Sequence, residues 1–292
     1  MVSVKARAAV ALIITIILFS TFEVVTKIMT ASMPPMQINF LRFFIGGLLL
    51  MPVALVDLKH RKYALSIDDW RGILLIGIIN VTICLSAFQI SIKYIPASAA
   101  AVIFCTNPVF VHLSESLLLK TRLSRQQILG LVISLFGLAM IFGNEFLWGS
   151  KSWIGLGLAL FAAATYGLYI VLAKGVTEKV GSLTANSFSF ILGALACIPV
   201  LLAKDVPLLT FTPTLWPYLL YLCLAVTALA YYCFLYGLQH LPAGTGSLIF
   251  FVKPVLASLL AFLILHEQIT LLFGIGGAII ILGLVVYTFD NR

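Results

Sequence analysis

The sequence predicts an all-α membrane protein with ten transmembrane helices in two inverted five-helix repeats. Three observations lead to this fold: the composition, a regular succession of apolar stretches, and an internal repeat. Hydrophobic residues make up 62% of the 292 residues, and charged residues only 10%. Soluble domains carry about 25% charged residues. The chain therefore lacks the polar surface that a protein surrounded by water requires.

The apolar stretches each approach the ~20 residues that cross a bilayer as a helix. They are predicted at residues 8–31, 36–56, 70–92, 97–119, 127–146, 153–174, 183–203, 215–238, 243–264 and 270–288. Lipid offers no hydrogen-bond partners to an open backbone, so each stretch is expected to be helical. The first stretch is interpreted as a retained span, because it is long and no clear cleavage site follows it.

The second half of the chain repeats the first at a shift of 146 or 147 residues. Residue types that chance rarely aligns match in order, including Lys27–Lys174, Asn39–Asn186, Phe43–Phe190, Gly46–Gly193, Trp70–Trp216, Phe88–Phe234, Pro108–Pro254, Gly130–Gly276 and Gly137–Gly283. Two units, 1–146 and 147–292, are therefore predicted within one membrane domain. Each unit has an odd number of crossings, so the second must be inverted, a recurrent plan of secondary transporters.

Basic residues fall mainly on one side of this topology. Lys62, Lys120 and Arg125 lie in loops on the side of the N-terminus, whereas few, such as Lys204, lie on the other. The positive-inside rule then predicts that both termini are cytoplasmic. The net charge of +8 is explained by topology and lipid headgroups, and no nucleic-acid partner is expected.

No motif for catalysis or for a bound cofactor is found. The five cysteines lie in apolar stretches without a CxxC spacing, so they are interpreted as packing residues, and no metal site is expected. Gly155-Leu156-Gly157 and Gly274-Ile275-Gly276 follow no strand and are interpreted as helix-packing glycines rather than nucleotide loops. Paired catalytic carboxylates are also missing. The sequence therefore predicts no enzyme and no catalytic residue.

Four stretches carry a resemblance to a known family. They are "NFLRFFIGGLLLMP" (39–52), "YIPASAAAVIFCTNPVF" (94–110), "HLPAGTGSLIFFVKPVLASLLAFLILHEQIT" (240–270) and "GIGGAIIILGLVV" (274–286). With them the chain resembles, over its whole length, the EamA-like family of the drug/metabolite transporter superfamily. The first repeat departs where Lys120-Thr121-Arg122 replaces the usual acid, which the second repeat keeps as Glu267. The resemblance implies ten helices and export of amino acids, related metabolites, drugs or other small solutes, in a bacterial inner membrane.

Lys253 is the most informative candidate for substrate binding. It lies midway along a predicted span, where a charge is costly unless it is paired or hydrated. It is either a cationic anchor for an anionic group or one partner of a structural ion pair. Lys253 and Asn107 directly precede Pro254 and Pro108, which are predicted to kink their helices near the midplane, where transporter sites lie.

Other polar residues predicted inside the membrane complete the candidate site. Arg42 is expected to contact substrate or to form a structural salt bridge with Glu23, which is also the first candidate for proton coupling. His112 is a second candidate, since imidazole titrates near neutral pH, although a lone histidine is more often satisfied by packing. Glu115 is given a structural role. Tyr166 and Tyr232 are candidates to line a cavity.

The predicted function is secondary transport of a small organic solute by alternating access, most simply export of an amino acid or related metabolite. The partners are the substrate, the lipid bilayer and, as candidate coupling ions, protons. The alternative is efflux of hydrophobic drugs or organic cations, with Lys253 held by Glu23 and aromatic residues forming the pocket. A membrane-embedded lipid-modifying enzyme is disfavoured, because it would require clustered acids, histidines or metal ligands at one depth.

Overall fold

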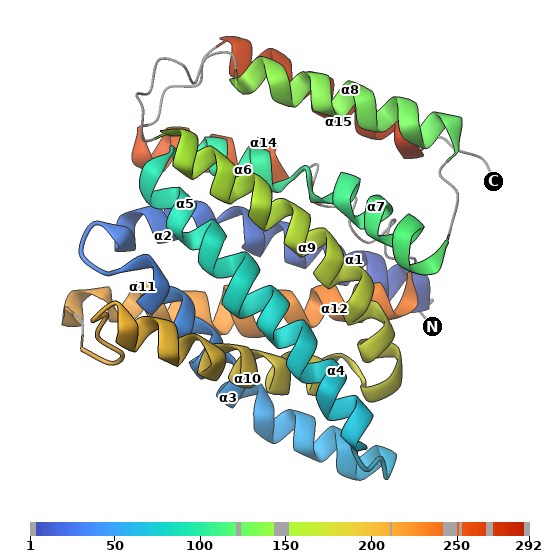
Figure 1. Cartoon of the computed structure of the whole chain (residues 1–292), viewed down its shortest axis with the longest axis vertical. Coiled ribbons are helices and arrows are strands. Elements are labelled where there is room, and N and C mark those ends of the chain that lie inside the picture. The colour runs from blue at the N-terminus through green and yellow to red at the C-terminus, as the bar shows by residue number, and fades with distance from the viewer. Residues whose placement is uncertain are drawn as a thin grey trace.

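The structure is a computed structural model that describes residues 4–120, 124–142, 152–210, 212–241, 250, 253–266 and 271–288. Within these ranges every regular element is a helix (Figure 1). The α-helices are α1 (Val4–Ser20), α2 (Phe22–Thr30), α3 (Pro35–Arg61), α4 (Ile67–Gly77), α5 (Ser86–Tyr94), α6 (Ala97–Phe104), α7 (Asn107–Leu119), α8 (Arg125–Phe142), α9 (Ser152–Val180), α10 (Ser182–Ala203), α11 (Trp216–Tyr221), α12 (Ala230–His240), α14 (Lys253–Leu265) and α15 (Leu271–Thr288). Two π-helices, η1 (Ile78–Leu85) and η4 (Leu222–Leu229), and a short 3-10 helix, η3 (Pro213–Leu215), connect some of them.

Within the described residues, seven helical stretches are long and apolar enough to cross a membrane. They are Ala6–Thr30, Pro35–Arg61, Ile67–Tyr94, Ala97–Leu119, Trp153–Val180, Ser182–Ala203 and Pro213–His240. These spans make the chain an integral membrane protein, as predicted. Helices α8, α14 and α15 lie at the three remaining predicted spans. The start of the predicted span 243–264 and Glu267 lie outside the described residues.

Helices α8 and α15 form a pair along one edge of the molecule (Figure 1). Glycines allow this close approach, because a Cβ on Gly130 would lie 2.5 Å from the carbonyl oxygen of Gly283, and one on Gly137 would lie 2.6 Å from that of Gly276. Small residues let membrane helices pack backbone to backbone. Each glycine of α8 thus faces the glycine of α15 that belongs to the other aligned pair.

The stretch Ala97–Leu119 consists of two helices separated by Cys105 and Thr106. Helix α6 ends at Phe104, and α7 begins at Asn107, with Pro108 as its second residue. Proline fits the first turn of a helix, where its missing N–H would have no partner. The kinks expected at Pro108 and Pro254 stay predictions. Pro254 lies in α14, and the two residues before Lys253 lie outside the described residues.

Two lysines that are equivalent in the internal repeat make equivalent contacts. Lys27 Nζ donates to the carbonyls of Ile92 (2.8 Å) and Ile95 (3.0 Å), at the end of α5. Lys174 Nζ donates to the carbonyls of Leu238 (3.1 Å) and Leu241 (3.2 Å), at the end of α12. Carbonyls at helix C-termini lack partners within the helix. In each half, one lysine therefore joins the first span to the end of the third.

Candidate functional site

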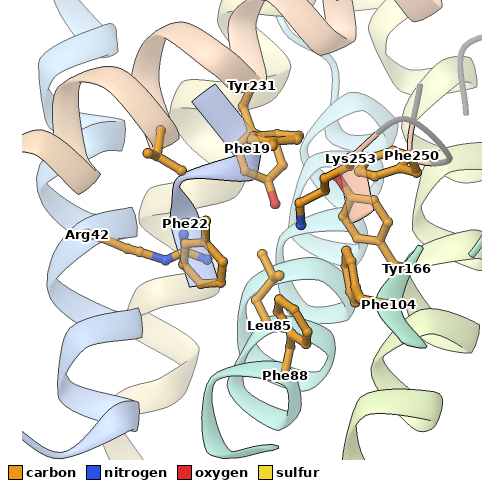
Figure 2. Close-up of a pocket in the computed structure, with 11 residues that line it drawn as sticks. Phe19, Phe22, Arg42, Leu85, Phe88, Phe104, Tyr166, Tyr231, Phe250 and Lys253 are labelled. Carbon is orange, nitrogen blue, oxygen red and sulfur yellow. The ribbon is translucent and has the colours of Figure 1, made fainter. Parts of the chain in front are cut away.

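A narrow cavity lies among the helices of both halves (Figure 2). Its lining combines large apolar side chains, two tyrosines and two cations: Phe19, Phe22, Arg42, Leu85, Phe88, Phe104, Tyr166, Val226, Tyr231, Phe250 and Lys253. Leu85 and Val226 belong to the π-helices η1 and η4. Such turns occur frequently at functional sites. The cavity has the apolar walls and few polar groups that are typical of a small-molecule site.

Stacked aromatic rings form much of the wall. Phe104 contacts Phe88, with ring centroids 4.2 Å apart, and Tyr166, at 4.9 Å. Phe250 meets Tyr166 edge to face at 5.4 Å. Phe104 and Phe250 are equivalent at the shift of 146 residues, so each half supplies the same ring. Phe104 and Phe250 were not predicted as site residues, although their equivalence in the two halves is a signal that the sequence contains.

Lys253 forms a buried ion pair with Glu23. Its Nζ donates to Oε1 of Glu23, and the two side chains are 3% and 1% exposed. The ammonium also lies 5.3 Å from the ring centroid of Phe104 and 5.7 Å from that of Phe88. Charges at this depth require a partner. The sequence left two roles open for Lys253, an anion anchor and an ion-pair partner, and the structure shows the ion pair.

Glu23 retains hydrogen-bonding capacity after this pairing. Its second oxygen, Oε2, accepts no hydrogen bond from the described residues although it is buried. The salt bridge expected between Glu23 and Arg42 is not formed among the residues that the structure describes. Helix α14 packs against α2 instead, and this packing places Lys253 beside the carboxylate of Glu23.

Arg42 is the second buried cation of the cavity and is 2% exposed. Its guanidinium carbon lies 4.3 Å from the ring centroids of both Phe22 and Phe43. Among the described residues it makes no hydrogen bond or ion pair, and its buried Nε has no acceptor. Figure 2 shows the guanidinium directed toward the cavity. Cation–π contacts offset part of its desolvation, but its planar set of N–H donors remains available to an anion.

The remaining predicted site residues divide between the cavity and its surroundings. Tyr166 lines the cavity as predicted. Tyr232 does not; it packs on Tyr236 with ring centroids 6.2 Å apart, and its neighbour Tyr231 lines the cavity instead. Asn107 is buried outside the lining and donates from Nδ2 to the carbonyl of Phe104 at 2.8 Å, across the break between α6 and α7.

His112 lies in a separate cluster, away from the cavity lining. Its Nδ1 is 3.1 Å from Oε2 of Glu115, and its Nε2 is hydrogen-bonded to the hydroxyl of Tyr287. The sequence analysis had placed no partner beside this histidine. Tyr287 comes from α15, so only the tertiary structure brings the three side chains together.

No site for a metal ion is found in the part of the chain that the structure describes. Groups of three or more His, Cys, Asp or Glu side chains are absent there. The five cysteines are buried and free. The polar chemistry of the cavity therefore comes from Arg42, Lys253, Glu23 and two tyrosine hydroxyls.

Comparison with known proteins extends this description. The model of the EamA-like transporter family matches residues 6–143 and again 153–289. An uncharacterized transporter of Clostridium kluyveri is 34% identical over 288 residues, which are 96% of this chain and 93% of that protein. One of Archaeoglobus fulgidus is 27% identical, over 95% of this chain and 96% of its own. A crystal structure with 20% identity covers 99% of both chains with a TM-score of 0.74, which shows a shared fold. The family expected from the sequence is thus confirmed: the chain belongs to the EamA-like transporter family and is a membrane transporter.

Proposed function

We propose that this transporter exports a small zwitterionic or anionic solute, such as an amino acid, and that Arg42 binds its carboxylate. The observation that carries the proposal is a buried guanidinium without an ionic partner among the described residues, beside a cavity. A guanidinium binds a carboxylate through two parallel hydrogen bonds. Removing both groups from water is offset when they pair inside the cavity.

The charges around the cavity favour an anion over a cation. Glu23 can balance only one of the two cations, and it already pairs with Lys253. Among the described residues, the cavity therefore has an excess positive charge at Arg42. The ammonium of a zwitterion has a candidate partner in Oε2 of Glu23, which is buried without a donor among the described residues. The aromatic rings would then enclose the solute's side chain.

Efflux of hydrophobic drugs or organic cations is the second candidate function. Its premise, that Lys253 is held by Glu23 within an aromatic pocket, agrees with the observed contacts. Cations bind well to aromatic faces. The unpaired guanidinium of Arg42 opposes this function, because it would repel a cation at short range in a medium of low dielectric constant.

Alternating access between two inverted five-helix repeats, 1–146 and 147–292, is the proposed mechanism. Three features support this arrangement. The family model matches the chain twice. Lys27 and Lys174 cap equivalent helix ends, and the α8–α15 contact pairs Gly130 with Gly283 and Gly137 with Gly276. A two-fold axis in the membrane plane would exchange those two glycine pairs, as expected for inverted repeats.

The first test is a thermal-shift screen of the purified protein in detergent. The panel spans amino acids, carboxylates, organic cations and nucleosides. A ligand that binds only the folded state raises the melting temperature. We expect stabilisation by amino or carboxylic acids. Stabilisation by organic cations alone would contradict the proposal and favour the drug-efflux function.

Arg42 variants identify the group that binds the carboxylate. Arg42→Lys retains the charge but loses the planar pair of donors, so we expect ligand affinity to fall about 10- to 100-fold, with a larger loss in Arg42→Met. Isothermal titration calorimetry with the stabilising ligand measures the change. Tyr232→Phe is the matched control, because Tyr232 lies outside the cavity and should leave affinity unchanged. Unchanged affinity in Arg42→Met would reject Arg42 as the anion site.

A further inference from the structure

A buried polar cluster that the proposed substrate site does not use lies where α7 meets α15. His112 Nε2 is hydrogen-bonded to the hydroxyl of Tyr287, and His112 Nδ1 lies 3.1 Å from Oε2 of Glu115, one turn further along α7. His112 is 6% and Tyr287 7% exposed, and the Glu115 side chain is 19% exposed. Three groups that can exchange protons are therefore linked in a row inside the membrane domain.

The lining of the narrow space beside the cluster carries no further charged side chain among the described residues. It is formed by Pro108, His112, Gly130, Leu131, Ser134 and Tyr287. From α8 only uncharged groups face this space, and α9 packs against α7 at Gly167, which has no side chain. Glu115 and Tyr287 are thus the titratable partners of His112. Among the described residues, Glu115 is the acidic group in contact with the imidazole.

The His112–Tyr287 contact joins the two halves of the chain, and the internal repeat predicts no equivalent contact on the opposite side of the membrane. Helix α7 belongs to residues 1–146 and α15 to residues 147–292. At the shift of 146 residues, Ser258 corresponds to His112, and Ile141 corresponds to Tyr287. Serine and isoleucine cannot form an equivalent bond at the other end. A motion that separates the halves at the His112 end would break this bond, and the opposite motion would leave it intact.

We propose that His112, Glu115 and Tyr287 form a proton-binding latch that holds α15 against α7. The inference rests on the proposed alternation of the two halves and adds a proton site separate from the substrate cavity. An ionised Glu115 can only accept, so Nδ1 of His112 carries a hydrogen. In the neutral imidazole Nε2 then accepts from the Tyr287 hydroxyl, whereas after proton uptake it donates to that oxygen.

The sign of the pH effect follows from the charges. The protonated imidazole forms an ion pair with Glu115, so the closed cluster is neutral. Loss of the proton leaves a partly buried carboxylate without a counter-charge, which is costly away from water. Low pH therefore stabilises the closed latch, and rising pH favours separation of α15 from α7.

Hydrogen–deuterium exchange of the full chain in lipid nanodiscs tests the latch without any substrate. Exchange at residues 281–288 is followed at pH 6 and pH 8 and corrected for the chemical effect of pH on amide exchange. We expect about tenfold slower corrected exchange at pH 6 in the unmodified protein, the effect of one charge-assisted bond. Tyr287→Phe keeps the ring and removes only the hydroxyl, so the pH difference should disappear, as it should in His112→Gln.

His240→Gln is the matched control. Its imidazole also lies near a tyrosine, with Nδ1 2.8 Å from the carbonyl of Tyr236, but the contact stays within α12. This variant should keep the full pH difference. Equal exchange at both pH values in the unmodified protein, or a difference that persists in Tyr287→Phe, would overturn the latch. Neither result depends on ligand binding at Arg42, so the substrate proposal is judged separately.

Discussion

Lys253 and Arg42 are both buried beside the cavity, and their different surroundings assign them different roles. Lys253 is a compact ammonium whose charge is balanced by Glu23. Arg42 is a flat, weakly hydrated guanidinium that stacks between Phe22 and Phe43. Arginine tolerates such stacking better than lysine. The residue that sequence reasoning favoured as the anion anchor is thus the paired one, and Arg42 is the better candidate for substrate binding.

The ion pair between Glu23 and Lys253 should be visible in a double-mutant cycle. Lys253→Met alone leaves a buried carboxylate uncompensated, which costs about 3–5 kcal/mol in comparable sites. We expect Glu23→Gln alone to be similarly destabilising and the double variant to be more stable than either. Thermal unfolding in detergent measures each variant. Lys204→Met, at an exposed position, is the control for removal of a lysine. Additive losses in the double variant would argue against a direct pair.

At the scale of elements, the apolar pattern predicted where helices lie but not where they are interrupted. The stretch 97–119 reads as one span, and the structure divides it at Cys105 and Thr106. Pro108 signalled an irregularity, since proline removes a backbone donor. The two π-helices η1 and η4 were not predicted, because an extra residue in a helical turn leaves no mark in an apolar sequence.

The glycine contact between α8 and α15 gives an element-scale prediction. Gly283→Ala would place a methyl group 2.5 Å from Ser134 Oγ and 2.6 Å from the Gly130 carbonyl oxygen. Overpacking of this kind costs about 1–3 kcal/mol, so the melting temperature should fall. Gly277→Ala, in the same helix, is the control because its Cβ would meet nothing within 4 Å. Equal melting temperatures for the two variants would contradict the close contact.

At the scale of the whole molecule, inversion of the two halves is the central prediction that remains. The loop 57–69 of the first half corresponds to the segment 204–215 of the second. Inverted repeats must place these equivalent segments on opposite sides of the membrane. The excess of lysine and arginine predicts that the first segment is cytoplasmic.

Reporter fusions test this orientation. Green fluorescent protein fused after Lys62 or after residue 292 should fluoresce, because it folds in the cytoplasm. Alkaline phosphatase fused after Lys204 should be active, because it requires the oxidising outer side. The exchanged fusions, with the reporters reversed at Lys62 and Lys204, are the controls and should be inactive. Activity of the same reporter at both positions would exclude inversion.

The sequence by itself determined the membrane class, the family, most helical spans and the polar residues that need an explanation inside a bilayer. These properties depend on composition and local order, since a run of apolar residues in lipid must form helices. Only the tertiary structure decided which residues meet. It paired Lys253 with Glu23, placed Tyr231 rather than Tyr232 at the cavity, and joined His112 to Tyr287. Such contacts link segments far apart in the chain, and they depend on the rotation and packing of each helix, which a nearly uniform apolar sequence does not encode locally.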